Sequence, residues 1–109
     1  VAARLNEVWP DGRSTRVGIG LLNLTHRDGH EHATALEPGR ACEAVVEMDD
    51  IAHAFVPGNR IAVALSTTYW PIAWPSPALA TLTVDCPASA LVLPVRPPRA
   101  EDDALEPFG

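Results

Sequence analysis

Three histidines lie within seven residues of this chain, in a stretch whose residue types could bind a metal. His26, His30 and His32, with Asp28 between them, are of the types that hold zinc and other transition metals. The spacing argues against a site, because Asp28-Gly29 predicts a turn and the sequence offers no second group of ligands to complete a tetrahedron. We expect a polar loop whose histidines are solvated or bonded to backbone, without a metal.

The residues that could catalyse hydrolysis have no suitable setting. Asp49 and Asp50 are adjacent at the end of a predicted strand, so their side chains face opposite ways and cannot flank one substrate as acid and base. Gly18-x-Gly20 lacks the third glycine and the following helix of a dinucleotide loop. No Gly-x-Ser-x-Gly elbow surrounds any candidate serine, whether Ser14, Ser66, Ser76 or Ser89. The sequence predicts a catalytically inert chain without a cofactor.

Aromatic residues gather among prolines in the segment STTYWPIAWPSP, residues 66–77. Its prolines at 71, 75 and 77 cannot donate to a β-ladder, so we expect a loop or an edge. Tyr69, Trp70 and Trp74 either stack on prolines within the domain or contact a partner. These three residues are the candidate interdomain or binding surface.

Alternating apolar residues predict the strands that must position these groups. Residues 42–48 are apolar at every second position, which is typical of a strand with one buried face. Residues 61–65 are apolar on both faces, so we expect a central strand there. A Pro-Gly turn followed by a polar residue and arginine, or by arginine alone, precedes each of the two.

Further strands are predicted at both ends of the chain. Residues 1–8 and 16–24 form the arms of a hairpin around the turn Trp9-Pro10-Asp11-Gly12, and Gly18 and Gly20 predict a bulge or the close approach of another backbone. Residues 80–84 and 91–95 give two more strands. We therefore expect at least six antiparallel strands in two layers and no helix longer than two turns.

Five short runs, taken in order, resemble the C-terminal non-catalytic domain of the X-Pro dipeptidyl-peptidase and CocE/NonD hydrolases. They are WPDGRS, LNLTHR, the LEPG turn, an acidic-ended strand, and FVPGNRIAVALS at residues 55–66, and the matching stretches extend from Ala3 to Val95. The resemblance implies an all-β antiparallel sandwich, a jelly roll similar to galactose-binding domains, with no metal. It also implies that the Ser-Asp-His triad belongs to a separate α/β-hydrolase domain, toward which the aromatic segment lies.

The pattern divides the chain into two parts. Residues 1–96 form the sandwich, interpreted as the C-terminal part of the family's jelly roll and so a partial domain, and residues 97–109 form an acidic tail containing Glu101, Asp102, Asp103 and Glu106. Because alternation starts at the first residue, we expect the chain to begin inside a strand. Neighbours of the missing strands would then expose an edge, and self-association through edge strands is a further expectation.

Composition limits the partners and the compartment. The 109 residues are 47% hydrophobic and 20% charged, as in one small soluble domain. A net charge of -6 without any lysine argues against nucleic acid, and no apolar run reaches the roughly 20 residues of a membrane span. Cys42 and Cys86 are predicted to be buried free thiols in strands, which favours the cytoplasm, with a disulfide across the sandwich as the alternative.

Two functions remain. The first is an accessory domain of a serine hydrolase, a dipeptidyl-peptidase or acyl esterase, packing on the catalytic domain and helping to wall its site. The second is a free-standing module that binds carbohydrate or a protein partner through the tryptophan loop. Exposed Trp70 and Trp74 beside carboxamides would favour a sugar, and the chain has no glutamine and only Asn6, Asn23 and Asn59.

Overall fold

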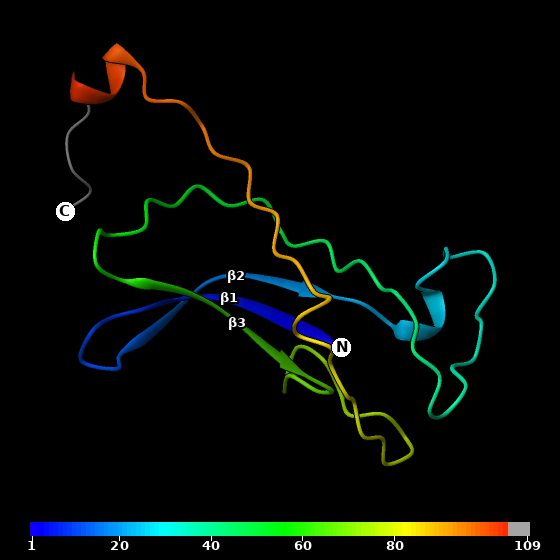
Figure 1. Ribbon diagram of the computed structural model, residues 1–109. Coiled ribbons are helices and arrows are strands. Elements are labelled where there is room, and N and C mark those ends of the chain that lie inside the picture. Colours follow the sequence, from blue (N-terminus) through cyan, green and yellow to red (C-terminus); the bar gives the residue numbers. More distant parts are fainter. Residues whose placement is uncertain (105–109) are drawn as a thin grey trace.

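The computed structural model describes residues 1–104 and shows one open antiparallel sheet of three strands (Figure 1). The strands are β1 (Ala2–Val8), β2 (Ser14–Leu21) and β3 (Arg60–Ser66), in the spatial order β2-β1-β3. Two short 3-10 helices, η1 (Leu24–His26) and η2 (Ala100–Ala104), complete the regular structure of the described residues. The predicted all-β antiparallel class is confirmed, whereas the expected six strands are not found in this part of the chain.

The hairpin of β1 and β2 forms as its sequence predicts. Gly12 has a φ of 88°, which glycine adopts without strain, and its N–H donates to the Trp9 carbonyl at 2.9 Å. Leu5 pairs with Gly18 but Asn6 pairs with Arg16, so one extra residue is inserted in β2 between them. This is the bulge that the glycines of the second arm indicated.

The two faces of the sheet differ in character. Ala3, Leu5 and Glu7 alternate along β1 on one side and are buried, and we call this side the core face. Arg4 lies on the other side of β1, which we call the arginine face because Arg16, opposite Asn6, and Arg60, opposite Val8, share it.

Strand β3 has the predicted extent but not the predicted position. It pairs only with β1 and is therefore an edge strand of the described sheet, so the expectation of a central strand is wrong for these residues. Its row on the core face, Ile61, Val63 and Leu65, is between 42% and 48% exposed. The apolar alternation gave the strand correctly, but alternation carries no information on how many neighbours a strand has.

The strand predicted at residues 42–48 is wrong: the segment is irregular. It nevertheless runs beside β2, because the Asp49 N–H donates to the Ile19 carbonyl at 2.9 Å and a Cβ at Gly20 would overlap the Glu47 carbonyl. Val46 and Met48 are half-buried, as the alternation predicted, whereas Cys42 and Ala44 of the same predicted row are exposed. The close backbone approach expected at Gly20 is thus confirmed, although one ladder bond is too few to make a strand.

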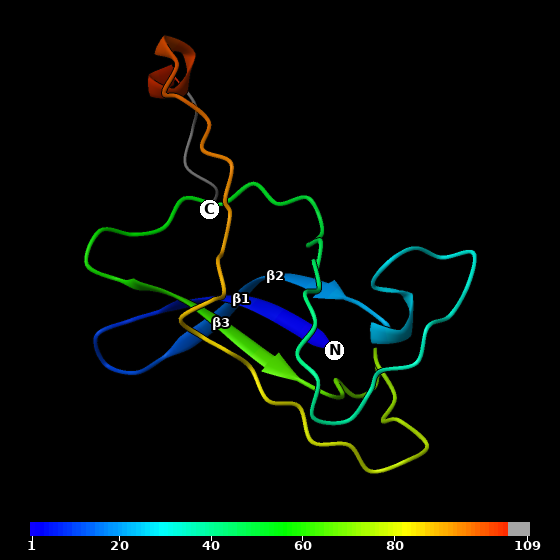
Figure 2. The ribbon, with the colours of Figure 1, turned by 45° about the vertical axis from the view of Figure 1, so that its right-hand side comes forward.

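The strands predicted at residues 80–84 and 91–95 are also wrong. Both segments are irregular and mostly exposed, and Figure 2 shows this part of the chain running past the sheet without joining it. A strand needs a partner for its N–H and C=O groups, and these segments find none among residues 1–104. Cys42 and Cys86 are free but exposed, so the expectation of burial fails with the strands that would have provided it.

Residues 96–104 lead away from the sheet (Figures 1 and 2). Asp102 accepts a hydrogen bond from Arg96 Nη2 at 2.8 Å and one from the Arg99 N–H at 2.9 Å, and these bonds lower the pKa of its carboxyl group. Glu106 of the predicted acidic tail lies outside the described residues, and the division of the chain at residue 96 stays a prediction. No helix within residues 1–104 has the length and apolar character needed to cross a membrane.

Candidate binding surface

The chain that follows β3 folds into a small loop held by its own hydrogen bonds. The Tyr69 N–H donates to the Ala73 carbonyl at 2.8 Å, and the Ala73 N–H returns a bond to the Tyr69 carbonyl at 2.7 Å. Thr68 adds a bond from its hydroxyl to the same Ala73 carbonyl at 2.9 Å. The peptide between Trp70 and Pro71 is cis. We call residues 69–74 the aromatic loop, and its loop character agrees with the expectation from its prolines.

Two tryptophan side chains of the aromatic loop face solvent. Trp70 is 65% exposed and Trp74 is 73% exposed, with ring centroids 4.9 Å apart and planes inclined at 60°. They contact each other and leave most of their apolar area open. An aromatic pair of this kind is more typical of a surface that meets another molecule than of a packed core.

Tyr69 attaches the aromatic loop to the arginine face of the sheet. Its ring centroid is 4.9 Å from the Arg4 guanidinium carbon and 5.6 Å from that of Arg16, both within cation-π range. Arg16 Nη1 also donates to the Tyr69 hydroxyl at 2.6 Å. The aromatic residues among prolines indicated Tyr69 from the sequence, but not the arginines. Arg4 lies on the polar side of the alternation in β1, and this pattern was a signal for it.

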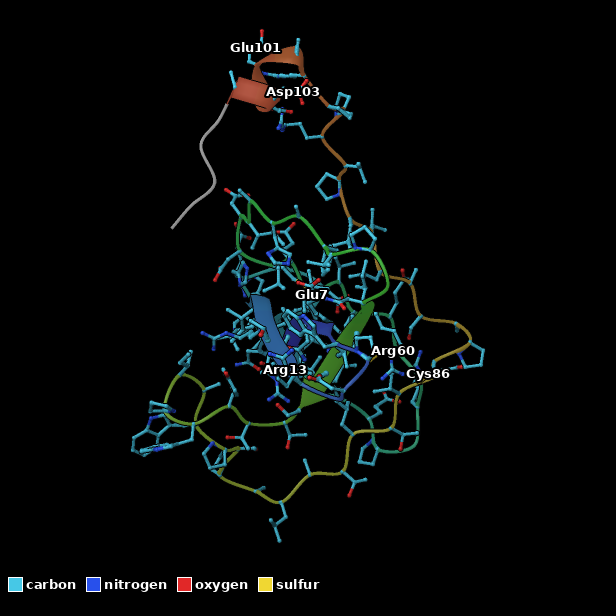
Figure 3. All side chains as sticks on the ribbon, turned by 90° about the vertical axis from the view of Figure 1, so that its left-hand side faces the viewer. Glu7, Arg13, Arg60, Cys86, Glu101 and Asp103 are labelled. Atoms are coloured by element: carbon cyan, nitrogen blue, oxygen red, sulfur yellow. The ribbon has the colours of Figure 1, made fainter. Side chains whose placement is uncertain are left out.

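Glu7 is the second notable group, and it lies buried on the core face (Figure 3). Its carboxylate accepts hydrogen bonds from Asn59 Nδ2 at 2.8 Å, from the Val56 N–H at 2.7 Å and from His53 Nε2 at 2.8 Å. These bonds, led by that of Asn59, lower the pKa of Glu7 below its ordinary value. We call this contact the Glu7 latch; it fastens residues 53–59 to β1.

The Glu7 latch is a structural contact that was not predicted from the sequence. Glu7 is two residues after Leu5 and four after Ala3, so it lies on the same buried side of β1. The alternation in the sequence therefore indicated a buried carboxylate. His53, which the sequence left without a role, donates to Glu7 and packs edge-on against Phe55, with ring centroids 4.8 Å apart. Because both carboxylate oxygens of Glu7 are engaged, the group is poorly suited to act on a substrate.

A model of the X-Pro dipeptidyl-peptidase C-terminal non-catalytic domain family matches residues 1–99. The chain belongs to this family. A cocaine esterase from Rhodococcus sp. (strain MB1 Bresler) is 32% identical over 69 residues, which cover 63% of this chain and 12% of the esterase. The chain therefore spans only a small part of that curated relative, and no solved structure matches it. The resemblance predicted from the five short runs is confirmed, and the chain is an accessory C-terminal domain of a hydrolase family.

The histidine cluster of this non-catalytic domain is only partly assembled. His26 and His30 stack with ring centroids 5.8 Å apart and line a hollow together with Val45 and Glu47, whereas His32 does not line it. Asp28 pairs with Arg27 at 3.4 Å. Within the described part of the chain, no three His, Cys, Asp or Glu side chains gather closely enough to hold a metal.

The other candidate groups stay apart in the non-catalytic domain. Asp49 and Asp50 are exposed on the segment beside β2. The hydroxyl of Ser66 donates to the Thr68 carbonyl at 2.6 Å, and that of Ser89 donates to the Asp85 carbonyl at 2.7 Å. Neither serine is thus paired with a base. The aromatic loop with its arginines stays the candidate surface for contact with another molecule.

Proposed function

We propose that this chain is the non-catalytic C-terminal domain of a serine hydrolase that cleaves acyl esters or peptides, and that it packs on the catalytic domain through the aromatic loop. The observation that carries the proposal is the exposure of Trp70 and Trp74 on a loop that Tyr69 fastens to the sheet. Tryptophan is among the residues that contribute most to protein interfaces. Family membership and the relation to an esterase support the hydrolase as the partner.

Packing would remove a large apolar area from water. A tryptophan side chain buries about 150–250 Å² in an interface, and roughly 25 cal/mol is gained per Å² of apolar surface covered. Two such rings could therefore contribute several kcal/mol, from which the costs of ordering and association must be subtracted. In this position the accessory domain would wall the hydrolase site without supplying a catalytic residue.

The proposal includes a jelly-roll sandwich similar to galactose-binding domains, of which the three described strands are one layer. The open edge of β3 and its exposed row Ile61, Val63 and Leu65 support this, because further strands would cover both. If those strands come from elsewhere in the parent protein, the isolated chain has β3 available for self-association. Neither nucleic acid nor membrane is part of the proposal, in keeping with the net charge of -6.

The packing is tested by producing this chain and the hydrolase domain separately and measuring their association by calorimetry. We expect binding, and we expect Trp70→Ala combined with Trp74→Ala to weaken it by about tenfold or more, as for central interface tryptophans. Trp9→Ala, on the hairpin turn, is the matched control and should leave the affinity unchanged. Absence of binding, or equal binding by the loop variant and the unchanged chain, would overturn the proposal.

A free-standing carbohydrate-binding module is the second candidate, and the exposure of both tryptophans favours it. Two observations weigh against it. The ring planes are inclined at 60° and so do not form a flat platform for a sugar. Asn59 is engaged by Glu7 and Asn23 by Thr25, which leaves Asn6 as the one asparagine without such a bond in the described chain. Titration with mono- and oligosaccharides, followed by tryptophan fluorescence, separates the two functions, and saturable quenching would favour the module.

We also propose a cytoplasmic location. Cys42 and Cys86 are both free and exposed, and a reducing compartment keeps such thiols from pairing. Fractionation of cells that produce the parent protein, with detection of both thiols by an alkylating reagent, tests this. Recovery of the protein outside the cell with oxidised cysteines would contradict it.

A further inference from the structure

The register of the sheet brings three arginines from three strands to one face. Arg16 of β2 lies on the arginine face opposite Asn6, and Arg60 of β3 lies there opposite Val8. Arg4 shares the face because alternate residues of β1 point the same way and directly paired residues of neighbouring strands do too. No stretch of sequence contains the cluster, since the three positions are far apart along the chain.

These arginines lack the carboxylates that accompany most other arginines of the chain. Arg13, Arg27, Arg40 and Arg96 each form an ion pair with an aspartate or glutamate, whereas Arg4, Arg16 and Arg60 form none within residues 1–104. The chain carries 14 acidic residues against 8 basic ones, so acidic side chains are plentiful elsewhere. The other strand residues on the arginine face are uncharged: Ala2, Asn6, Val8, Ser14, Ile19, Leu21, Ala62, Ala64 and Ser66.

The aromatic loop adds an apolar surface next to this basic face. Tyr69 lies against the guanidinium groups of Arg4 and Arg16, and Trp70 and Trp74 extend outward from it. Arg4 Nε is buried and has no hydrogen-bond partner, so the ring rather than an acceptor holds this guanidinium. Stacking on a ring leaves the edge of a guanidinium free to bind a carboxylate. Arginine, tyrosine and tryptophan are also the residues most enriched at interface hot spots.

The spread of the charges indicates the kind of partner. Arg4 and the position opposite Arg60 are four residues apart on β1, which is about 14 Å at 3.4 Å per residue. A single small anion cannot reach both ends of this row. Several carboxylates fixed on one surface can, and apolar side chains beside them would cover the tryptophans.

We propose that the arginine face and the aromatic loop together bind an acidic patch of the hydrolase domain, whose Asp or Glu carboxylates pair with Arg4, Arg16 and Arg60. This inference rests on the proposed packing of the two domains. It adds which side of the sheet is used and the charge of the surface that it meets. Charge complementarity of this kind speeds association and fixes the orientation of the partners.

The test measures association of the chain with the separately produced hydrolase domain at low and at high salt. Because screening shortens the reach of charges, the unchanged chain should bind more weakly at high salt. Arg60→Glu, which does not disturb Tyr69, should weaken binding at low salt by about tenfold, and adding Arg16→Glu should weaken it further. Arg40→Glu is the matched control, with the same charge change at an exposed loop position, and should leave binding unchanged. Circular dichroism checks that each variant folds.

The outcomes separate the inference from the proposed function. Binding that is insensitive to salt and to Arg60→Glu would overturn the inference while leaving the packing through the tryptophans intact. No binding at any salt concentration would overturn both. If an arginine variant fails to fold, the salt dependence of the unchanged chain still tests the inference, because binding that is equally strong at low and at high salt would overturn it.

Discussion

Glu7 shows how one side chain can organise a loop far away in the sequence. Its carboxylate accepts bonds from three groups of residues 53–59 and is shielded from water by the segment it holds. A buried carboxylate is costly unless it is hydrogen-bonded, and here each oxygen has a donor. The latch thus holds the chain immediately before β3.

The latch predicts a specific dependence of stability on pH. The folded-state pKa of Glu7 lies below its ordinary value of 4.5, so its contribution to stability is fully present above that value and is lost as pH falls through the lowered pKa. Glu7→Gln keeps the shape but removes the charge, and should lower the midpoint of thermal unfolding at neutral pH by about 5 °C. The difference in unfolding midpoint between wild type and Glu7→Gln should narrow at acidic pH, as the pH falls below 4.5 through the lowered pKa of Glu7.

Thermal unfolding followed by circular dichroism at both pH values measures this. Glu37→Gln is the control, because Glu37 is exposed and pairs only with Arg40, and it should change the midpoint little. A gap between wild type and Glu7→Gln that stays constant from neutral to acidic pH would show that the charge of Glu7 does not support the fold.

At the level of elements, the chain separates into segments that local sequence determines and segments that it does not. The hairpin was predictable because Asp11-Gly12 makes its turn and alternation makes its arms. Strand β3 was predictable for the same reason. Residues 80–84 and 91–95 have an equally good strand pattern but no partner strand within residues 1–104. A local sequence pattern does not determine which strands pair.

The candidate surface was predictable to a similar degree. Tyr69, Trp70 and Trp74 were identified because aromatic residues among prolines cannot form a regular strand. Arg16 and Arg60 were not, since only the register of β2 and β3 against β1 brings them to the same face. Contacts that depend on the pairing of distant strands are the part of a site that a single sequence conceals.

The segment beside β2 gives a prediction at this scale. Gly20→Ala would place a Cβ against the Glu47 backbone carbonyl, which cannot move without displacing the segment, and should destabilise the domain by about 1–3 kcal/mol. Gly18→Ala meets the Ile51 Cγ2 at 3.2 Å, the end of a side chain that can rotate, and should cost less. Urea unfolding of both variants compares them; equal losses would mean that Glu47 does not pack closely on β2.

At the scale of the whole molecule, the open edge of β3 predicts association between copies. The side of β3 that pairs with no strand among residues 1–104, and its exposed apolar row, resemble the edges that add a strand from a second chain. We expect the isolated chain to sediment as a dimer or larger species at tens of micromolar, and Val63→Lys to shift it toward monomer. Thr15→Lys, on a β2 position of the core face, is the control. A folded monomer for the unchanged chain would contradict the prediction.

This chain on its own should also show no ester-hydrolysing activity. No serine of the described residues is bonded to a histidine, so no nucleophile has its base. Added to a nitrophenyl acyl ester, the chain should release nitrophenol no faster than buffer. Turnover that disappears when one of its serines is replaced by alanine would show that the chain carries a nucleophile of its own.

The Glu7 latch also has a consequence for the order in which the chain folds. The two strands of the hairpin are neighbours in sequence and can meet within microseconds, whereas Asn59 must find Glu7 across 52 residues. Closing this loop costs more chain entropy than closing the hairpin turn and is slower. The hairpin of β1 and β2 is therefore expected to form before residues 53–59 dock. Once residues 53–59 dock on Glu7, Arg60 lies next to β1, and the rest of β3 can then pair with β1 residue by residue. Docking of residues 53–59 on the buried glutamate is therefore expected to precede the pairing of β3 with β1.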